Sequence, residues 1–154
     1  MKLSDKGIDL LIRLEGEVLT AYYCEAGILT IGVGHTGDDV YEDMWITEEQ
    51  SRSLLKKDIN RFERAVDKQF PKGIKQNQFD AFVLFAFNVG IYGFKSSTAL
   101  KKAKGHGSDL DVVMWLKKWV YVTNDGVKTR SKGLVKRRNA ESCCYLSANY
   151  TKWV

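Results

Sequence analysis

Three side chains near the N-terminus have types and spacing that could carry acid–base chemistry. Glu15, Cys24 and Thr30 lie within the stretch LEGEVLTAYYCEAGILTIGVGHT, residues 14–36. A protonated carboxyl group can donate a proton to a leaving group, a thiolate is a good nucleophile, and a hydroxyl can accept and donate hydrogen bonds at once. The thiol is the unexpected member, because it falls in a turn where polar residues are the usual choice. The chemistry of the group therefore depends on what Cys24 can do.

A helix and a hairpin are needed to position these residues. Ser4 is a suitable cap for a first helix in which Ile8 and Leu11 recur at helical spacing. Glu15 falls on the same apolar face, where desolvation favours a protonated carboxyl group. From residue 21 to residue 35 the pattern changes to a short β-hairpin rich in glycine.

The rest of the chain is predicted to be helical. A capping box at Thr47 opens a helix whose apolar stripe ends at Phe70, and this helix could connect two lobes. The segment NQFDAFVLFAFNVG, residues 77–90, is apolar on nearly every side and is expected to be the buried central helix of a C-terminal lobe. Shorter helices are expected at residues 97–104, 109–120 and 134–147, with a turn at residues 124–126. The sequence therefore predicts an α+β, mainly α fold.

Composition excludes several classes of protein. With 154 residues and 44% hydrophobic content, the chain can bury a substantial core. No apolar run is long enough for a membrane span, and the N-terminal segment lacks the apolar core of a secretory signal. We therefore expect synthesis in the cytoplasm and no stable membrane association. Three cysteines and two histidines without a CxxC pair favour a reduced chain without a metal or other cofactor.

Charge is unevenly distributed along the chain, whose formal net charge is +5. Residues 1–94 carry 11 basic and 15 acidic side chains, a net of −4, whereas residues 95–138 carry 12 basic and 3 acidic side chains, a net of +9. Such a basic face either serves as a solvated surface or attracts an anionic polymer, which could be nucleic acid or bacterial cell wall. A nucleic-acid-binding module would show aromatic residues interleaved with Lys and Arg on an exposed face, or a reading motif, and neither is evident. Attraction to cell-wall polymers is favoured.

Four ordered motifs resemble those of the phage-type lysozymes, the muramidase endolysins of tailed phages. The first is EG-x-x-L-x-AY…G-x-x-TIG-x-GHTG, at residues 15–37. It is followed by QNQFDAFVLFAFNVG at residues 76–90, GFKSSTAL at residues 93–100 and GLVKRRNAE at residues 133–141. The resemblance covers roughly residues 8–146, and the order of the four motifs makes it specific.

The resemblance implies a lysozyme-like two-lobed fold with a small N-terminal β-hairpin lobe, a long connecting helix and a helical C-terminal lobe. The lobes would be residues 12–60 and residues 1–11 plus 70–154 of a single lysozyme domain, residues 1–154, joined by helix 47–70. The implied reaction is hydrolysis of the β-1,4 bond between N-acetylmuramic acid and N-acetylglucosamine in bacterial peptidoglycan, which lyses the host cell. A monomer is expected, held in the host cytoplasm until lysis and dependent on a holin to reach the wall peptidoglycan.

The resemblance makes Glu15 the catalytic acid and Thr30 the residue that holds the attacking water. The family usually has an aspartate nine residues after the glutamate, where this chain has Cys24. In an inverting enzyme the second carboxylate lies about 6.5–9.5 Å from the acid. A thiol, with an ordinary pKa of about 8.5, is a poorer base for orienting water. Four interpretations are open: Cys24 supports turnover with help from Thr30, the Asp-to-Cys change slows hydrolysis, the adjacent Glu25 supplies the carboxylate, or the protein only binds wall glycan.

Further site residues follow from the resemblance. Arg137 could close on Glu15 and bias its protonation, or could lie on the basic surface. Asn88, Ser97 and Thr98 match polar positions that the family turns toward the sugar chain and its peptide, although each could equally serve as a helix cap.

Two other pairs are expected to be structural. His35 and Asp58 match positions that would form a partly buried ion pair beside the connecting helix. Trp115 and Trp119, four residues apart on one expected helix, are favoured as core residues over sugar-binding platforms.

Overall fold

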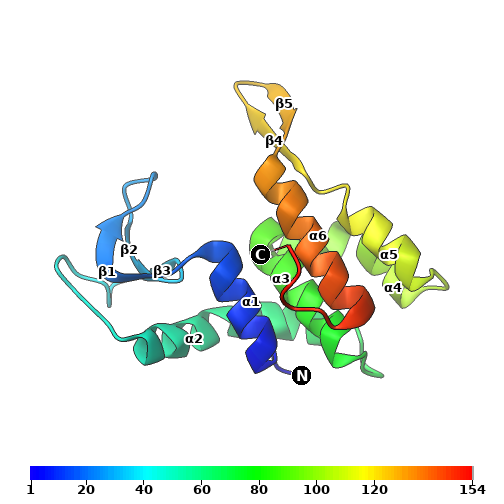
Figure 1. Cartoon of the computed structure of the whole chain (residues 1–154), viewed down its shortest axis with the longest axis horizontal. Helices are drawn as coiled ribbons and strands as arrows, with labels where there is room; N and C mark the ends of the chain where they lie inside the picture. Colours follow the sequence, from blue (N-terminus) through cyan, green and yellow to red (C-terminus); the bar gives the residue numbers. More distant parts are fainter. Residues whose placement is uncertain (154) are drawn as a thin grey trace.

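The computed structural model describes residues 1–153, and within them the chain forms six helices and two small antiparallel sheets. Figure 1 shows the small three-stranded sheet at one end of helix α2 and the remaining helices gathered around α3. The elements in order are α1 (Asp5–Glu15), β1 (Val18–Tyr23), β2 (Leu29–Gly32), β3 (His35–Thr36), α2 (Glu48–Asp67), α3 (Gln76–Ser96), α4 (Thr98–Lys104), α5 (Asp109–Leu116), β4 (Tyr121–Asn124), β5 (Val127–Arg130) and α6 (Lys132–Ser147). The predicted α+β, mainly α architecture is confirmed.

Helix α1 has the expected cap and the expected buried face. The Ser4 hydroxyl accepts a hydrogen bond from the Gly7 N–H at 3.0 Å, which satisfies one of the free donors of the first turn. Leu10 and Leu11 are fully buried in the main core. The helix ends because Gly16 has a φ of +81°, a conformation that other residues rarely adopt. Glu15 is therefore the last helical residue.

The small sheet has the strand order β1-β2-β3, and all neighbouring strands are antiparallel. The turn between β1 and β2 is closed by two backbone hydrogen bonds: Cys24 N–H donates to the Ile28 carbonyl at 3.0 Å, and Gly27 N–H donates to the Cys24 carbonyl at 2.8 Å. Ile31 of β2 belongs to a second, smaller hydrophobic cluster that is separate from the main core. The hairpin predicted for residues 21–35 is present, with a third short strand.

Helix α2 joins the two hydrophobic clusters. Thr47 and Gln50 form the predicted capping box at its start. Two consecutive leucines then point to different sides of the helix: Leu54 packs against the small cluster, whereas Leu55 is buried in the main one. Adjacent residues on a helix point in different directions, so α2 can contribute side chains to both clusters.

Helix α3 forms the centre of the main core, as predicted. Its residues from Phe79 to Ala86 are buried, and helices α2, α4 and α6 pack around it. Gly90 has a φ of +83° and interrupts the helix, so the last six residues run in a new direction. Asn88 therefore lies where the buried rod ends.

The segment after α5 differs from the prediction. The helix expected at residues 109–120 ends at Leu116, and the turn expected at residues 124–126 is the tip of an antiparallel hairpin, β4–β5. Asp125 and Gly126, with φ values of 48° and 77°, form the two-residue loop that the Asp-Gly sequence favours in hairpins. No helix among residues 1–153 is both long enough and apolar enough to cross a membrane.

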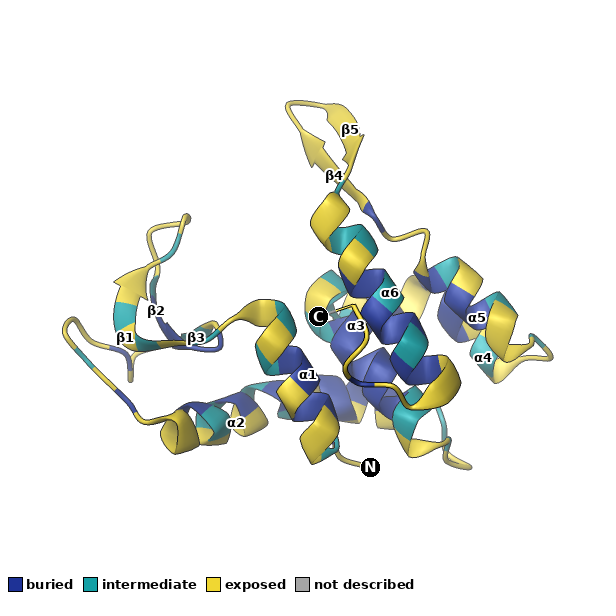
Figure 2. Ribbon diagram, viewed as in Figure 1, coloured by how far each residue is buried: buried dark blue, intermediate teal, exposed yellow. Residues whose placement is uncertain are grey.

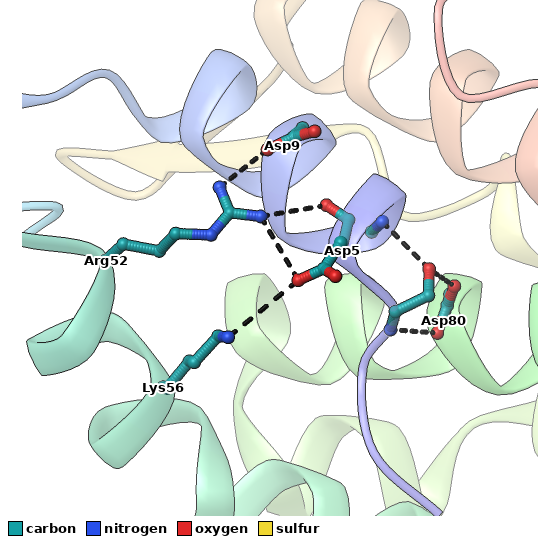
Figure 3. Close-up of polar contacts among 7 residues, drawn as sticks. Asp5, Asp9, Arg52, Lys56 and Asp80 are labelled. Carbon is teal, nitrogen blue, oxygen red and sulfur yellow. Dashed lines mark hydrogen bonds and ion pairs between the residues drawn. The ribbon is translucent and has the colours of Figure 1, made fainter. Parts of the chain in front are cut away.

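Polar contacts fasten α1 to its neighbours, as Figure 3 shows. Arg52 of α2 donates to Asp9 at 2.6 Å, and Lys56 lies 3.8 Å from Asp5. These pairs are exposed to solvent. Deeper in the molecule, the fully buried Asp80 of α3 accepts a hydrogen bond from the backbone N–H of Ser4 at 3.1 Å.

The Asp80 carboxylate is predicted to contribute far more to stability than the exposed acids of α1. It accepts further hydrogen bonds from the Ser4 hydroxyl, from Gln76 at 2.7 Å and from the Tyr150 hydroxyl at 2.8 Å. Asp80→Ala leaves these donors without an acceptor and should lower the free energy of unfolding by about 3 kcal/mol. Urea unfolding measures the change. The matched control is Asp9→Ala, which loses one exposed ion pair and should cost less than about 1 kcal/mol; equal losses would contradict the account.

Candidate active site

Glu15 lies at the C-terminal end of α1, where its carboxylate faces the start of α6. Its side chain is 29% exposed, so its carboxylate is partly, and not fully, removed from water. The buried residues of α1 all lie at or before Leu11, and the last turn extends beyond the core. Partial exposure leaves the carboxylate accessible from solvent, and an arginine rather than apolar packing fixes its position.

That arginine is Arg137, and the structure brings it onto Glu15 rather than onto the open basic surface. Its Nη1 donates to Glu15 Oε1, and its side chain is only 8% exposed. The other guanidinium nitrogens are also used: Nε donates to Glu141 at 3.1 Å and Nη2 donates to the Leu84 carbonyl at 3.1 Å. The guanidinium is therefore fixed on three sides, and Glu15 is bound to a rigid donor.

Glu141 and Arg138 complete a buried charge cluster that the sequence reasoning missed. Both side chains have no exposed surface. Arg138 Nη2 lies 3.0 Å from Glu141 Oε1 and donates to Asn88 Oδ1 at 2.6 Å, while its guanidinium lies over the Phe85 ring at 5.0 Å. The spacing of the motif RRNAE, with an acid three and four residues after the two arginines, was the available signal.

The burial of this cluster disfavours charge. Burial raises the pKa of Glu141 and lowers the pKa of Arg138, and in each case the attraction between the two groups opposes the shift. Arg137 and Arg138 both pair with Glu141, and their two positive charges exceed the single negative charge of that glutamate. The surplus is directed at Glu15, a carboxylate with solvent access.

Cys24 and Thr30 lie together at the turn of the small sheet. The half-buried Cys24 thiol has a pKa below its ordinary value, chiefly because of the Ile28 N–H, with a further contribution from the Ala26 N–H. Thr30 is 3% exposed and its hydroxyl donates to the Ile28 carbonyl at 2.8 Å. Because a hydroxyl has one proton, Thr30 in this orientation can only accept further hydrogen bonds. Glu25, the alternative carboxylate, is exposed in the same turn.

The three residues expected to contact substrate have different environments. Asn88 is exposed at the end of the buried part of α3 and is oriented by Arg138. Ser97 takes the helix-cap alternative: it is 1% exposed, donates to the Phe94 carbonyl and caps α4 through the Leu100 N–H, so its hydroxyl is fully engaged within the fold. Thr98 is half-buried in the first turn of α4. Of the three, Asn88 is the residue that the fold presents to solvent beside Arg137.

His35 forms the expected ion pair and has a second partner. Its Nδ1 lies 2.8 Å from Asp58 of α2 and its Nε2 lies 3.0 Å from Asp39. Burial lowers the pKa of His35, but the two carboxylates act together against it, and the net pKa is raised. The pair attaches β3 to α2.

A groove runs between the small sheet and the helical body. One cavity of about 640 Å³ is lined by Gly34 and Thr36 on the sheet side and by Phe62 and Phe87 on the helical side. A second, of about 470 Å³, shares Phe62 and Phe87 and reaches Asn88. A third, of about 390 Å³, contains Asn88 and Arg137. The cavities share lining residues, so they form one elongated surface suited to a polymer.

A mainly helical fold with a small sheet, a glutamate held by an arginine at the end of the first helix and an elongated groove define a lysozyme-type glycoside hydrolase. The family described as Phage lysozyme matches residues 12–141. The chain is 38% identical over 151 residues to the endolysin of Acyrthosiphon pisum secondary endosymbiont phage 1, covering 96% of this chain and 100% of that protein. The chain belongs to the phage lysozyme family.

Solved structures agree with this assignment. An endolysin from Escherichia coli O157:H7 phage FAHEc1 superposes with a TM-score of 0.90 at 38% identity, covering 99% of this chain and 98% of that one. A point mutant of P22 lysozyme superposes with a TM-score of 0.84 at 35% identity, covering 96% of this chain and 99% of that one. The two-lobed fold expected from the motifs is confirmed.

The His35–Asp58 pair is predicted to stabilise the protein in a pH-dependent way. Because the folded pKa of His35 is raised, its contribution is fully present below the unfolded pKa of about 6.5 and is lost as pH rises through the folded pKa. Asp58→Asn should therefore lower the free energy of unfolding by about 2 kcal/mol near pH 5, the scale of a hydrogen bond to a charged group, and by less near pH 9. Urea unfolding of both proteins at the two pH values measures this. A loss that stays constant with pH would contradict it.

Proposed function

We propose that the chain hydrolyses the β-1,4 bond between N-acetylmuramic acid and N-acetylglucosamine in bacterial peptidoglycan, with Glu15 as the catalytic acid. The observation that supports this most directly is the bond between Glu15 and Arg137 at the edge of the groove. Membership of the phage lysozyme family supplies the reaction class, and the relatives named endolysins supply the biological role, lysis of the host cell.

In this proposal Glu15 donates its proton to the oxygen of the scissile bond as that bond breaks. The partial exposure of the Glu15 side chain allows a sugar chain in the groove to reach it. Arg137 fixes the direction of the carboxyl group, because its own position is fixed by Glu141 and by the Leu84 carbonyl. Arg137 is therefore a positioning residue, and Glu15 is the group that touches the reacting atoms.

Cys24 and Thr30 would handle the attacking water. Thr30 donates its proton to Ile28, so it accepts a hydrogen bond from the water and turns a lone pair of the water toward the sugar. The Cys24 thiolate then takes the second water proton as the oxygen attacks the anomeric carbon. Alternatively, the thiolate attacks that carbon itself and a water later releases the sugar. The lowered thiol pKa favours both routes, because each needs the thiolate.

The second candidate function is that of a catalytically impaired form that binds wall glycan. The presence of a thiol at Cys24, where the family usually has a carboxylate, favours it, because a neutral thiol is a weak hydrogen-bonding group. The elongated groove would still bind a glycan strand. The experiment below separates the two functions.

The proposal extends to the route of the enzyme to its substrate. We propose a monomer that remains in the host cytoplasm until lysis and depends on a holin to reach the wall peptidoglycan. Expression of the chain in a bacterial host with and without a holin tests this. Lysis that depends on the holin supports it, and lysis by the chain alone contradicts it.

Clearing of a purified peptidoglycan suspension is predicted to depend on both catalytic positions. Glu15→Gln should reduce the rate by about 10²–10⁴-fold, the usual contribution of general acid catalysis, and Cys24→Ala should reduce it strongly as well. Iodoacetamide should inactivate the native chain and spare Cys24→Asp, which retains the other two cysteines as a control.

Three outcomes would change the assignment. If only Cys24→Asp clears the suspension, the chain is the impaired form. If Cys24→Ala is as active as the native chain and Glu25→Gln is not, Glu25 supplies the carboxylate. If Glu15→Gln retains full activity, the proposed acid is wrong.

A further inference from the structure

The largest of the three groove cavities has a basic wall, made of Lys57, Arg61 and Arg64 of α2. All three residues line the cavity of about 640 Å³ between the small sheet and the helical body. Residues spaced by three or four positions lie on one face of a helix, and at a rise of about 1.5 Å per residue this row is about 10 Å long. The three residues are exposed, and Figure 2 shows exposed stretches between the buried ones along α2. The basic wall is therefore open to a ligand in the groove.

The fold does not neutralise the charges of the basic wall. Within residues 1–153, none of its three side chains forms an ion pair. Other basic residues of α2 do have partners, since Arg52 and Lys56 pair with acids of α1. Lys57 and Arg61 also lie four positions apart, and like charges at that spacing destabilise a helix. A bound anion would offset this repulsion.

The acids near the basic wall already have a partner. Asp58 is the only acid among the residues that line the cavity, and its carboxylate lies 2.8 Å from His35 Nδ1. Asp39 lies outside the lining, and its pKa is lowered chiefly by a hydrogen bond from His35, with a smaller effect from Lys57. Both carboxylates are thus bound to His35, and the cavity keeps a surplus of positive charge.

Aromatic packing holds Arg61 in place for an anion. Its guanidinium carbon lies 4.6 Å from the centre of the Phe62 ring, and Phe62 packs against Phe87 with ring centres 5.2 Å apart. Both rings line the cavity. A guanidinium that lies over a ring keeps the N–H donors at its edge free, in a planar fork that matches two oxygens of one anion.

The number of cations favours phosphate over a single carboxylate. A phosphate monoester carries a charge of about −1.5 to −2 at pH 7 and three strong acceptor oxygens, so it can bind several cations at once. A carboxylate has one charge and two oxygens in one plane. Two arginines and a lysine in one row therefore match phosphate better.

The position of the cavity indicates what would carry this phosphate. The cavity shares Phe62 and Phe87 with the neighbouring cavity that reaches Asn88. A glycan that lies along the groove would therefore bring a substituent of one of its sugars to the basic wall. Glu15 does not line this cavity, so that sugar would lie away from the bond that is cleaved.

We propose that the basic wall binds a phosphate ester carried by a hydroxyl group of the wall glycan, with Lys57, Arg61 and Arg64 contacting the phosphate oxygens. This proposal rests on the proposed function and names a substituent that the groove selects. Glycan without phosphate still binds, but with lower affinity.

The test is calorimetric titration of Glu15→Gln with two ligands. One is a muramyl oligosaccharide with a phosphate on the primary hydroxyl of its muramic acid, and the other is the same oligosaccharide after phosphatase treatment. The phosphorylated form should bind about tenfold more tightly, the scale of one charge-assisted hydrogen bond. Adding Lys57→Gln/Arg61→Gln should abolish this preference. The matched control, Lys56→Gln/Lys68→Gln, removes the same charge from exposed lysines outside the cavity and should keep it.

Several results would overturn the proposal. Equal affinity for the two oligosaccharides would exclude a phosphate site, and a control that loses as much as the cavity variant would indicate bulk charge. Inorganic phosphate that binds as tightly as the phosphorylated oligosaccharide would assign the site to free phosphate. Tighter binding to anionic phospholipid vesicles would assign it to lipid headgroups, and an equal preference for an oligosaccharide with peptide stems and no phosphate would assign it to carboxylates.

The binding measurement separates this proposal from the proposed function, because Glu15→Gln does not need to turn over. If the native chain proves inactive on peptidoglycan, a preference that depends on Lys57 and Arg61 still supports the phosphate site. If the native chain is active and Glu15→Gln shows no preference, the phosphate site is wrong and the proposed function stands.

Discussion

The structure depends on one buried carboxylate placed between two arginines. Glu141 has no exposed surface, and both Arg137 and Arg138 bind it from the preceding turn of α6. Burial of three ionised groups is costly, and removal of one partner would leave uncompensated charge. What the arrangement provides is position: Arg137 reaches Glu15 at the end of α1, and Arg138 reaches Asn88 at the end of the buried part of α3. Glu15 and Asn88, which are distant in the sequence, are thereby both fixed by α6.

The small sheet is attached to this point through α2 rather than through the cluster. Leu54 and Leu55 divide α2 between two hydrophobic cores, and the His35–Asp58 pair fastens the sheet to the same helix. The acid therefore belongs to the helical body, while Cys24 belongs to the sheet. The placement of the two proposed catalytic groups relative to each other is therefore set by α2, which contains neither of them.

Much of the fold could be predicted from the sequence because its signals are local. The capping box at Thr47 and the apolar run of residues 77–90 specify helices without reference to distant residues. The burial of the charge cluster was missed although the spacing of RRNAE was a signal for it, because an arginine is assumed to be exposed until a buried partner is known. The hairpin at residues 121–130 was missed because its strands have no buried face and hence no alternation of apolar and polar residues. The role of Ser97 stayed open at the level of sequence, because a hydroxyl that caps a helix and one that binds a sugar look alike there, and the structure shows the cap.

The thiol at Cys24 makes the chemical outcome the central question. The most direct test is to digest purified peptidoglycan with the native chain and to identify the reducing ends of the released fragments by mass spectrometry. Our account predicts fragments that end in N-acetylmuramic acid. Fragments that end in N-acetylglucosamine, or no fragments above those formed by Glu15→Gln, would contradict it.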